Sequence, residues 1–211
     1  MLQSPLDLEL TYFDLHGGRA EPARIALHMG GVPFTDTRIP PKSFAETKAS
    51  YPFAQLPILR VGDLVISQNN AINRYVGHLA GLYPTDPLAA ACCDEVLEAL
   101  EDVNHKFARS LHIADPERFE STRKKVVAGP LSFAIERMGQ LLTRRGGVWF
   151  AGDALSVADL KCFVWVRTLS SGKLDHVPTD LVARLAPNLA DHHERVRTLP
   201  GVVAYYAQFG L

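Results

Sequence analysis

The strongest constraint on the fold is a change of sequence pattern near residue 82. Before it, short alternating segments are interleaved with helical ones, which predicts an α/β layer. After it, apolar residues recur at helical spacing. The stretch LYPTDPL between the two parts holds two prolines and no periodic pattern. We therefore expect an α/β domain over residues 6–81, a linker over 82–88 and an all-helical domain over 89–211.

The first domain is predicted to follow the order β-α-β, then β-β-α. In LELTYF, Leu8, Leu10 and Tyr12 share one face of a strand. The next helix has Pro22 in its first turn and stops at a glycine pair. The expected elements are a strand over 8–13, a helix over 19–29, a strand over 33–39, a hairpin of 58–61 and 64–67, and a helix capped by Gln68 or Asn69 that buries Ile72, Tyr75, Val76 and Leu79.

The second domain is predicted to contain helices alone. They are expected over about 88–111, 116–143, from 156 onward, 188–198 and 201–208. Ser156 and Asp159 have the spacing of a capping box. His192 and His193 lie on a short helix without a nearby third metal ligand, so we expect them at the surface.

Composition excludes several classes of function. The 211 residues carry 22 basic and 23 acidic side chains, a net charge of -1 that gives no field to recruit nucleic acid or an anionic membrane. No apolar run approaches the roughly 18 residues of a transmembrane helix, and MLQSPLDLEL lacks the apolar core of a secretory signal. A cytoplasmic protein with a small neutral or zwitterionic ligand is expected.

The cysteines argue against a disulfide framework and against a metal site. Cys92, Cys93 and Cys162 are odd in number and have no CxxC or metal-ligand spacing, so we expect reduced packing residues and no metal. Because none precedes residue 92, the first domain has no cysteine nucleophile.

Four segments at compatible spacing point to one family. They are TYFDLHGGRAEPAR (11–24), FAQLPIL (53–59), SQNNAI (67–72) and GDALSVADL (152–160). Together they resemble a cytosolic glutathione transferase of the tyrosine type, closest to the pi and sigma classes. The resemblance implies a thioredoxin-like N-terminal domain that binds glutathione, an all-helical C-terminal domain that supplies most of the electrophile pocket, and a homodimer.

The resemblance also implies roles for individual residues. Tyr12 would hold the glutathione thiolate, and Arg19 follows in the same motif. The triplet Gln55-Leu56-Pro57, with Pro57 cis, would pair its backbone with the cysteinyl part of glutathione. Lys48 would reach the glycyl carboxylate, and Asp102 would reach the γ-glutamyl amine bound to the partner subunit.

The helix that starts near Asn69 suits the γ-glutamyl carboxylate, because helix N-termini offer N–H donors and a positive dipole end. Gln68 and Asn69 would share this contact, although both could be no more than a helix cap. The family usually has serine where this chain has Asn69. Two further departures are a glycine turn one residue longer, at Gly17-Gly18, and Lys42 in place of a tryptophan.

Each assignment has a simpler structural alternative. Tyr12 could be a strand-end aromatic, Arg19 an exposed helix-start residue, and Asp102 part of a solvated acidic face with Glu98 and Glu101. Arg24 is expected to be structural. Phe53 matches an aromatic key that docks into the partner in pi-type dimers, but it could equally be a core residue.

The function expected from the sequence is conjugation of glutathione to small apolar electrophiles. Alternatives on the same scaffold are a glutathione-dependent isomerase of the prostaglandin D synthase kind and a non-enzymatic carrier or structural relative. A cysteine-dependent oxidoreductase is disfavoured by the cysteine positions.

Overall fold

The computed structural model describes residues 7–211, so the first residue of the expected α/β domain, residue 6, lies outside the described residues. By their contacts the described residues form two units. One comprises the residues up to Tyr83 together with Pro200–Leu211, and the other comprises Pro84–Leu199. The sequence-based division assigns residues 200–211 to the helical domain, whereas here they pack with the first unit, where α10 (Pro200–Ala207) lies against α1 (Glu21–Met29).

The first unit is built on one mixed sheet. Within the described residues its four strands have the order β2-β1-β3-β4, and their bounds are β1 (Leu8–Phe13), β2 (Thr35–Ile39), β3 (Ile58–Val61) and β4 (Leu64–Ser67). The pair β1 and β2 is parallel, and the other two pairs are antiparallel. The strand over 8–13 and both hairpin strands have the predicted bounds.

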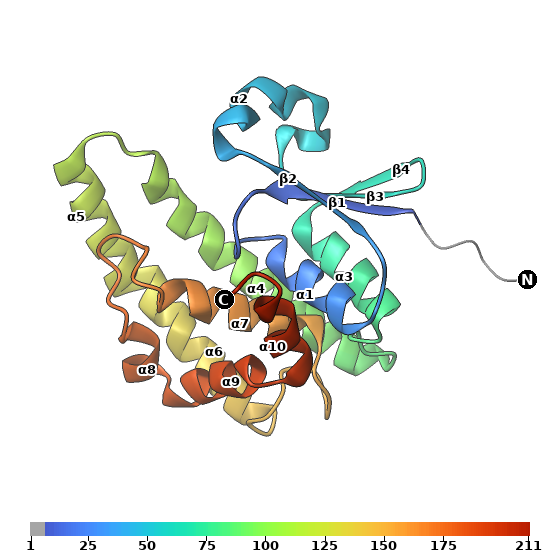
Figure 1. Cartoon of the computed structure of the whole chain (residues 1–211). Helices are drawn as coiled ribbons and strands as arrows, with labels where there is room; N and C mark the ends of the chain where they lie inside the picture. The colour runs from blue at the N-terminus through green and yellow to red at the C-terminus, as the bar shows by residue number, and fades with distance from the viewer. Residues whose placement is uncertain (1–6) are drawn as a thin grey trace, which may run out of the picture. The chain divides into compact units, whose positions relative to one another are not determined.

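Helices cover the sheet as the β-α-β and β-β-α order requires. The helices α1 and α3 (Asn69–Ala80) lie on one side of the sheet, and the segment around α2 (Phe44–Thr47) lies on the other (Figure 1). That segment also contains the short 3-10 helices η1 (Pro41–Ser43), η2 (Lys48–Ser50) and η3 (Pro52–Ala54). Gly30 allows α1 and α3 to approach closely, because a Cβ at Gly30 would lie 2.6 Å from the Ala80 Cα.

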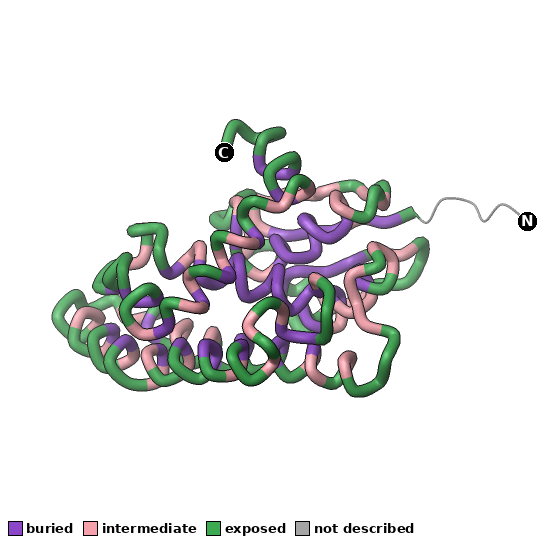
Figure 2. Tube along the Cα trace, turned by 90° about the horizontal axis from the view of Figure 1, so that it is seen from below, coloured by how far each residue is buried: buried purple, intermediate pink, exposed green. Residues whose placement is uncertain are grey.

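The second unit is helical throughout. Its elements are α4 (Pro87–Ala108), η4 (Arg109–His112), α5 (Pro116–Val126), the π-helix η5 (Val127–Leu131), α6 (Ser132–Arg144), α7 (Val157–Leu169), α8 (Leu181–Leu185) and α9 (Pro187–Arg197). The tube in Figure 2 changes between purple and green within single helices, as amphipathic helices require. In contrast, α7 is buried along nearly its whole length and packs against α4 and α9. It is therefore the central helix of this unit.

The predicted capping box starts α7. The Asp159 carboxylate accepts hydrogen bonds from the backbone N–H and the hydroxyl of Ser156, both at 2.8 Å. It also accepts from the Phe150 N–H at 3.0 Å and lies 2.9 Å from Nε2 of His192. The expectation that His192 is a surface residue is therefore wrong: α9 packs on α7 and buries the ring completely against this carboxylate.

One predicted helix is interrupted. The sequence predicts a single helix over 116–143, whereas the structure inserts the π-helical turn η5 between α5 and α6. Pro130 lies inside that turn, and because proline has no N–H it cannot continue the regular hydrogen-bond ladder.

Candidate functional site

Three of the predicted segments meet at one end of the sheet. In the register, Thr11 of β1 is opposite Ile58 of β3, and Ile58 is opposite Ser67 of β4. The next residue outward on each strand is Tyr12, Pro57 or Gln68. Strand pairing alone therefore brings the tyrosine, the proline triplet and the start of α3 to the same edge.

The Tyr12 side chain is held closely by the turn that follows it. Its hydroxyl accepts a hydrogen bond from the backbone N–H of Arg19 at 3.2 Å, and the residue is only 5% exposed. Gly18 lies against the ring with φ of +70°, and a Cβ there would approach the hydroxyl to 2.8 Å. Only glycine fits that position without displacing the tyrosine. The glycine turn and the tyrosine hydroxyl therefore form one unit.

The Gln55-Leu56-Pro57 triplet leads directly into β3. Its Leu56–Pro57 peptide bond is cis, as predicted. Leu56 and Pro57 are buried, whereas Gln55 is exposed.

Gln68 has an unusual backbone for a residue with a side chain. Its φ of 73° and ψ of 115° lie outside the regions that such residues commonly adopt. Strain of this kind costs about 1–3 kcal/mol and is concentrated at functional sites. Gln68 is exposed and occupies the N-cap position of α3 without a side-chain capping bond.

Asn69 is the first residue of α3 and is 6% exposed. Of the two residues predicted to cap the helix, Gln68 therefore occupies the N-cap position, and Asn69 is already inside the helix. Asn69 nevertheless lies at the N-terminus of α3, where the helix dipole is positive, as expected.

The two lysines considered for the site both lie in the segment around α2. Lys48 belongs to η2 and Lys42 to η1, and both are exposed. An aromatic contact connects this segment to the sheet, since the ring centres of Phe44 and Phe13 are 5.2 Å apart. Phe44 also stacks on Tyr51 within the segment, with ring centres 6.3 Å apart.

Asp102 lies in the second unit, exposed on α4. Its neighbour Glu101 points inward instead and forms an ion pair with Lys161 of α7 at 3.1 Å. A continuous solvated face of Glu98, Glu101 and Asp102 therefore does not exist, because Glu101 is only 9% exposed.

The sequence did not reveal that Arg24 and Glu21 are both fully buried beside the Tyr12 turn. Two charges three residues apart on a predicted helix look like an exposed pair. Their burial could have been predicted only from the pairing of β1 with β2, because that pairing brings Asp36 to Arg24.

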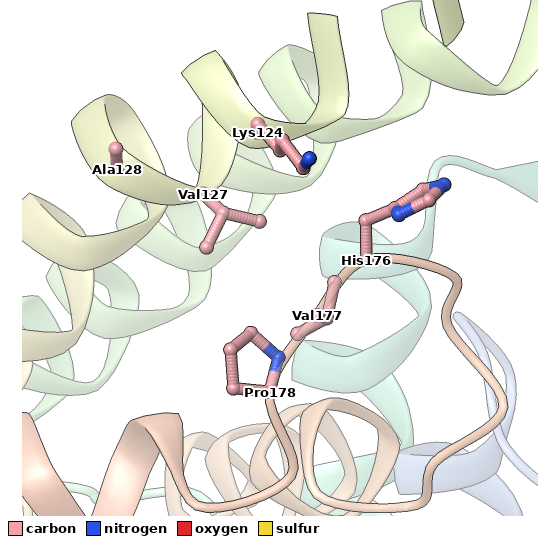
Figure 3. Close-up of a pocket in the computed structure, with 6 residues that line it drawn as sticks. All are labelled: Lys124, Val127, Ala128, His176, Val177 and Pro178. Atoms are coloured by element: carbon pink, nitrogen blue, oxygen red, sulfur yellow. The ribbon is translucent and has the colours of Figure 1, made fainter. Parts of the chain in front are cut away.

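A cavity of about 470 Å³ lies in the second unit, where Lys124, Val127, Ala128, His176, Val177 and Pro178 line it (Figure 3). None of these described residues is a predicted site residue.

Across residues 7–211 there is no group of three His, Cys, Asp or Glu side chains able to hold a metal ion. The same residues include no helix of the length and apolarity that crossing a membrane requires. Cys92, Cys93 and Cys162 are free thiols.

The first unit has a thioredoxin-like sheet, with a cis-proline and the start of a helix at one end of its strands, and the second unit is helical. This two-part architecture is that of the cytosolic glutathione transferases. The model of the glutathione S-transferase N-terminal domain matches residues 8–78, and that of the C-terminal domain matches residues 101–208. The chain belongs to the glutathione S-transferase family.

Individual relatives agree with this assignment. Glutathione S-transferase 1 of Ascaris suum is 29% identical, over 95% of each chain. The hematopoietic prostaglandin D synthase of Gallus gallus is 30% identical, over 93% of this chain and 94% of the relative. The solved structure of the Onchocerca volvulus pi-class glutathione S-transferase is 27% identical, with a TM-score of 0.80 over 96% of this chain and 93% of that one.

Proposed function

We propose that this protein is a cytoplasmic, homodimeric glutathione transferase that conjugates the glutathione thiolate to small apolar electrophiles, a detoxification chemistry. The observation that carries the proposal is the meeting of Tyr12, Pro57 and Gln68 at one edge of the sheet. The free thiols agree with a reducing compartment.

Tyr12 supplies the hydrogen bond that favours the thiolate. A thiol with a pKa of about 8.5 is only about 3% ionised at pH 7, and lowering that pKa by two units requires ~2.7 kcal/mol. A charge-assisted hydrogen bond is worth about 1.5–3 kcal/mol, so one tyrosine O–H suffices for most of the change. The shielded position of Tyr12 strengthens such a bond, because little water competes with it.

Ionisation alone is a weak catalyst. Lowering the pKa by two gives roughly 25-fold more thiolate. With the Brønsted slope of about 0.4–0.5 known for thiol–disulfide exchange, each thiolate also becomes ~8-fold less nucleophilic, so the net gain in rate is only about 3-fold. Holding the electrophile against the sulfur must supply the rest. Within the first unit, the side chains proposed for this apolar wall are Phe13, Leu15 and one of Tyr205, Tyr206 or Phe209.

The remaining residues bind the charged ends of glutathione. The start of α3 receives the γ-glutamyl carboxylate, with Gln68 and Asn69 as donors, because that helix end carries positive partial charge. The backbone of the Gln55-Leu56-Pro57 triplet pairs with the cysteinyl unit. Lys48 and Arg19 add positive charge, and Asp102 of one subunit serves the glutathione bound to the other.

A second candidate is a glutathione-dependent isomerase, which the similarity to a prostaglandin D synthase favours. The two functions share the thiolate and differ in whether the sulfur stays attached to the product. A non-enzymatic carrier is the third alternative.

Turnover of aryl halides, epoxides, enals and hydroperoxides with glutathione, followed by mass spectrometry of the products, separates these functions. We expect stable thioether products that are absent without glutathione. Rearranged products free of glutathione would indicate the isomerase, and ligand binding without turnover would indicate a carrier.

The glutathione site itself is tested at Asn69. Asn69→Ser keeps a short polar group at the helix start and should bind glutathione about as well as the parent. Asn69→Leu should bind at least tenfold more weakly in calorimetric titrations, because an apolar side chain replaces a hydrogen-bonding group worth about 1.5 kcal/mol or more to a charged partner. Full affinity in Asn69→Leu would place the site elsewhere.

A further inference from the structure

The turn between β1 and α1 is held in place by one buried side chain. Arg24 of α1 is fully buried. Its Nη1 donates to the Leu15 carbonyl at 3.0 Å, and its Nη2 donates to the Phe13 carbonyl at 3.5 Å. These carbonyls lie one and three residues after Tyr12, so a single guanidinium fixes the first part of the turn against the helix.

The same guanidinium is anchored on two other elements. Its Nε donates to Asp36 Oδ1 of β2 at 2.9 Å, and its Nη1 lies 3.3 Å from Glu21 Oε2 in α1. Asp36 also accepts from Nε of Arg38 at 2.7 Å. Two arginines and two carboxylates thus balance their charges, which makes burial of the cluster tolerable.

The far end of the turn closes on the Tyr12 hydroxyl. The Arg19 N–H donates to that oxygen at 3.2 Å, and the Gly18 backbone lies against the ring. Because an oxygen that accepts this N–H keeps its own proton for another partner, the turn determines where Tyr12 donates. The Arg24 guanidinium carbon lies over the Tyr12 ring, 5.8 Å from the ring centre.

We propose that Arg24 is a positioning residue for the Tyr12 hydroxyl, acting through the turn of residues 13–19 that its guanidinium holds. The inference rests on the proposed function, in which Tyr12 stabilises the glutathione thiolate. Only arginine fits this role, because its planar fork donates to two carbonyls and two carboxylates at once, whereas a lysine is a single point charge. Arg24→Lys keeps the charge and loses this geometry.

The test is an absorbance titration of bound glutathione thiolate in the parent, Arg24→Lys, Tyr12→Phe and the double variant. We expect Arg24→Lys, like Tyr12→Phe, to raise the pKa of the bound thiol. Each rise of one in that pKa lowers the thiolate fraction at neutral pH about tenfold. The double variant should titrate like Tyr12→Phe alone, because Arg24 acts only through Tyr12.

Arg145→Lys is the matched control. Arg145 also donates to a backbone carbonyl, that of Phe150 at 3.2 Å, and to a carboxylate, that of Glu95 at 2.5 Å, but in the second unit. Its variant should titrate like the parent. If Arg24→Lys does not fold, Asp36→Asn takes its place, since it removes the carboxylate that anchors the Arg24 guanidinium on β2 and should raise the same pKa.

The outcomes separate this inference from the proposed function. A Tyr12→Phe variant that shifts while Arg24→Lys, or Asp36→Asn in its place, titrates like the parent overturns the role of Arg24 alone. The same holds if the shifts of Arg24→Lys and Tyr12→Phe add in the double variant. A Tyr12→Phe variant that does not shift overturns both.

Discussion

At the scale of single residues, Asn73 shows how far a local pattern can mislead. The helical pattern after residue 69 predicts that Ile72, Tyr75, Val76 and Leu79 are buried. Ile72 and Val76 are buried, but Tyr75 and Leu79 are only partly so, and Asn73 is fully buried between them. Among the described residues, neither polar atom of its amide has a hydrogen-bond partner.

Replacing this amide should stabilise the protein. Burying an amide without hydrogen bonds costs about 1–3 kcal/mol, so Asn73→Leu should raise the free energy of unfolding in urea by about 1–2 kcal/mol. Asn70→Leu is the control: Asn70 is also buried, at 7% exposed, but does have interaction partners, so its loss should destabilise. A less stable Asn73→Leu would mean that ordered water satisfies the amide.

The residues of the candidate site also differ in how far the sequence predicts them. Tyr12, Pro57 and Gln68 were predictable as a group from the family resemblance of their motifs, and the pairing of β3 with β4 followed from the hairpin pattern, whereas the pairing of β1 with β3 did not. The backbone of Gln68 was not predictable, because a positive φ at a residue with a side chain contradicts local preference and is imposed by the surrounding structure.

At the scale of elements, prediction succeeded where one signal determined both ends. The hairpin has its predicted bounds because alternation sets the strands and Gly62 sets the turn at φ +57°. The segment 41–54 and α8 were missed, because elements of three to five residues bury too little apolar surface to produce a periodic pattern. The helix over 116–143 was predicted unbroken although Gly129 and Pro130 are typical interrupters.

We expect the stability of the second unit to depend most on the N-terminus of α7. Asp159 accepts hydrogen bonds from the Phe150 and Ser156 N–H groups and lies against His192. Asp159→Ala should cost about 3–5 kcal/mol in urea unfolding, the usual loss for removing one partner of a buried charged network. Ser156→Ala removes only the cap hydroxyl and should cost about 1 kcal/mol. Equal losses in the two variants would contradict the central role of the carboxylate.

At the scale of the whole molecule, Phe53 is the residue that most suggests a second subunit. It lies in η3 with φ of 55° and is 75% exposed, which contradicts a core position. Burial of an aromatic side chain is favourable, so a partner subunit that covered Phe53 would be held by it. Phe53→Ser should therefore convert the proposed dimer to a monomer in sedimentation experiments without lowering the free energy of unfolding of the isolated chain. A monomeric parent, or a dimeric Phe53→Ser, would remove Phe53 from the interface.

Asp102 tests whether the proposed dimer completes the glutathione site. Asp102→Asn removes a charge from an exposed residue of α4, so it should leave the dimer intact. Glutathione affinity should fall about tenfold, the equivalent of one hydrogen bond to a charged group. Unchanged affinity in calorimetry would return Asp102 to a purely solvated role.

The central claim is that the Tyr12 hydroxyl stabilises the glutathione thiolate, and the absorbance titration of bound thiolate in Tyr12→Phe tests it most directly. The substitution removes one oxygen and almost no packing, so the fold should survive. The thiol pKa should rise toward about 8.5, the value of a free thiol, and the rate at neutral pH should fall and partly recover in alkali. A titration curve identical to that of the parent would contradict the claim and leave Tyr12 as a strand-end aromatic.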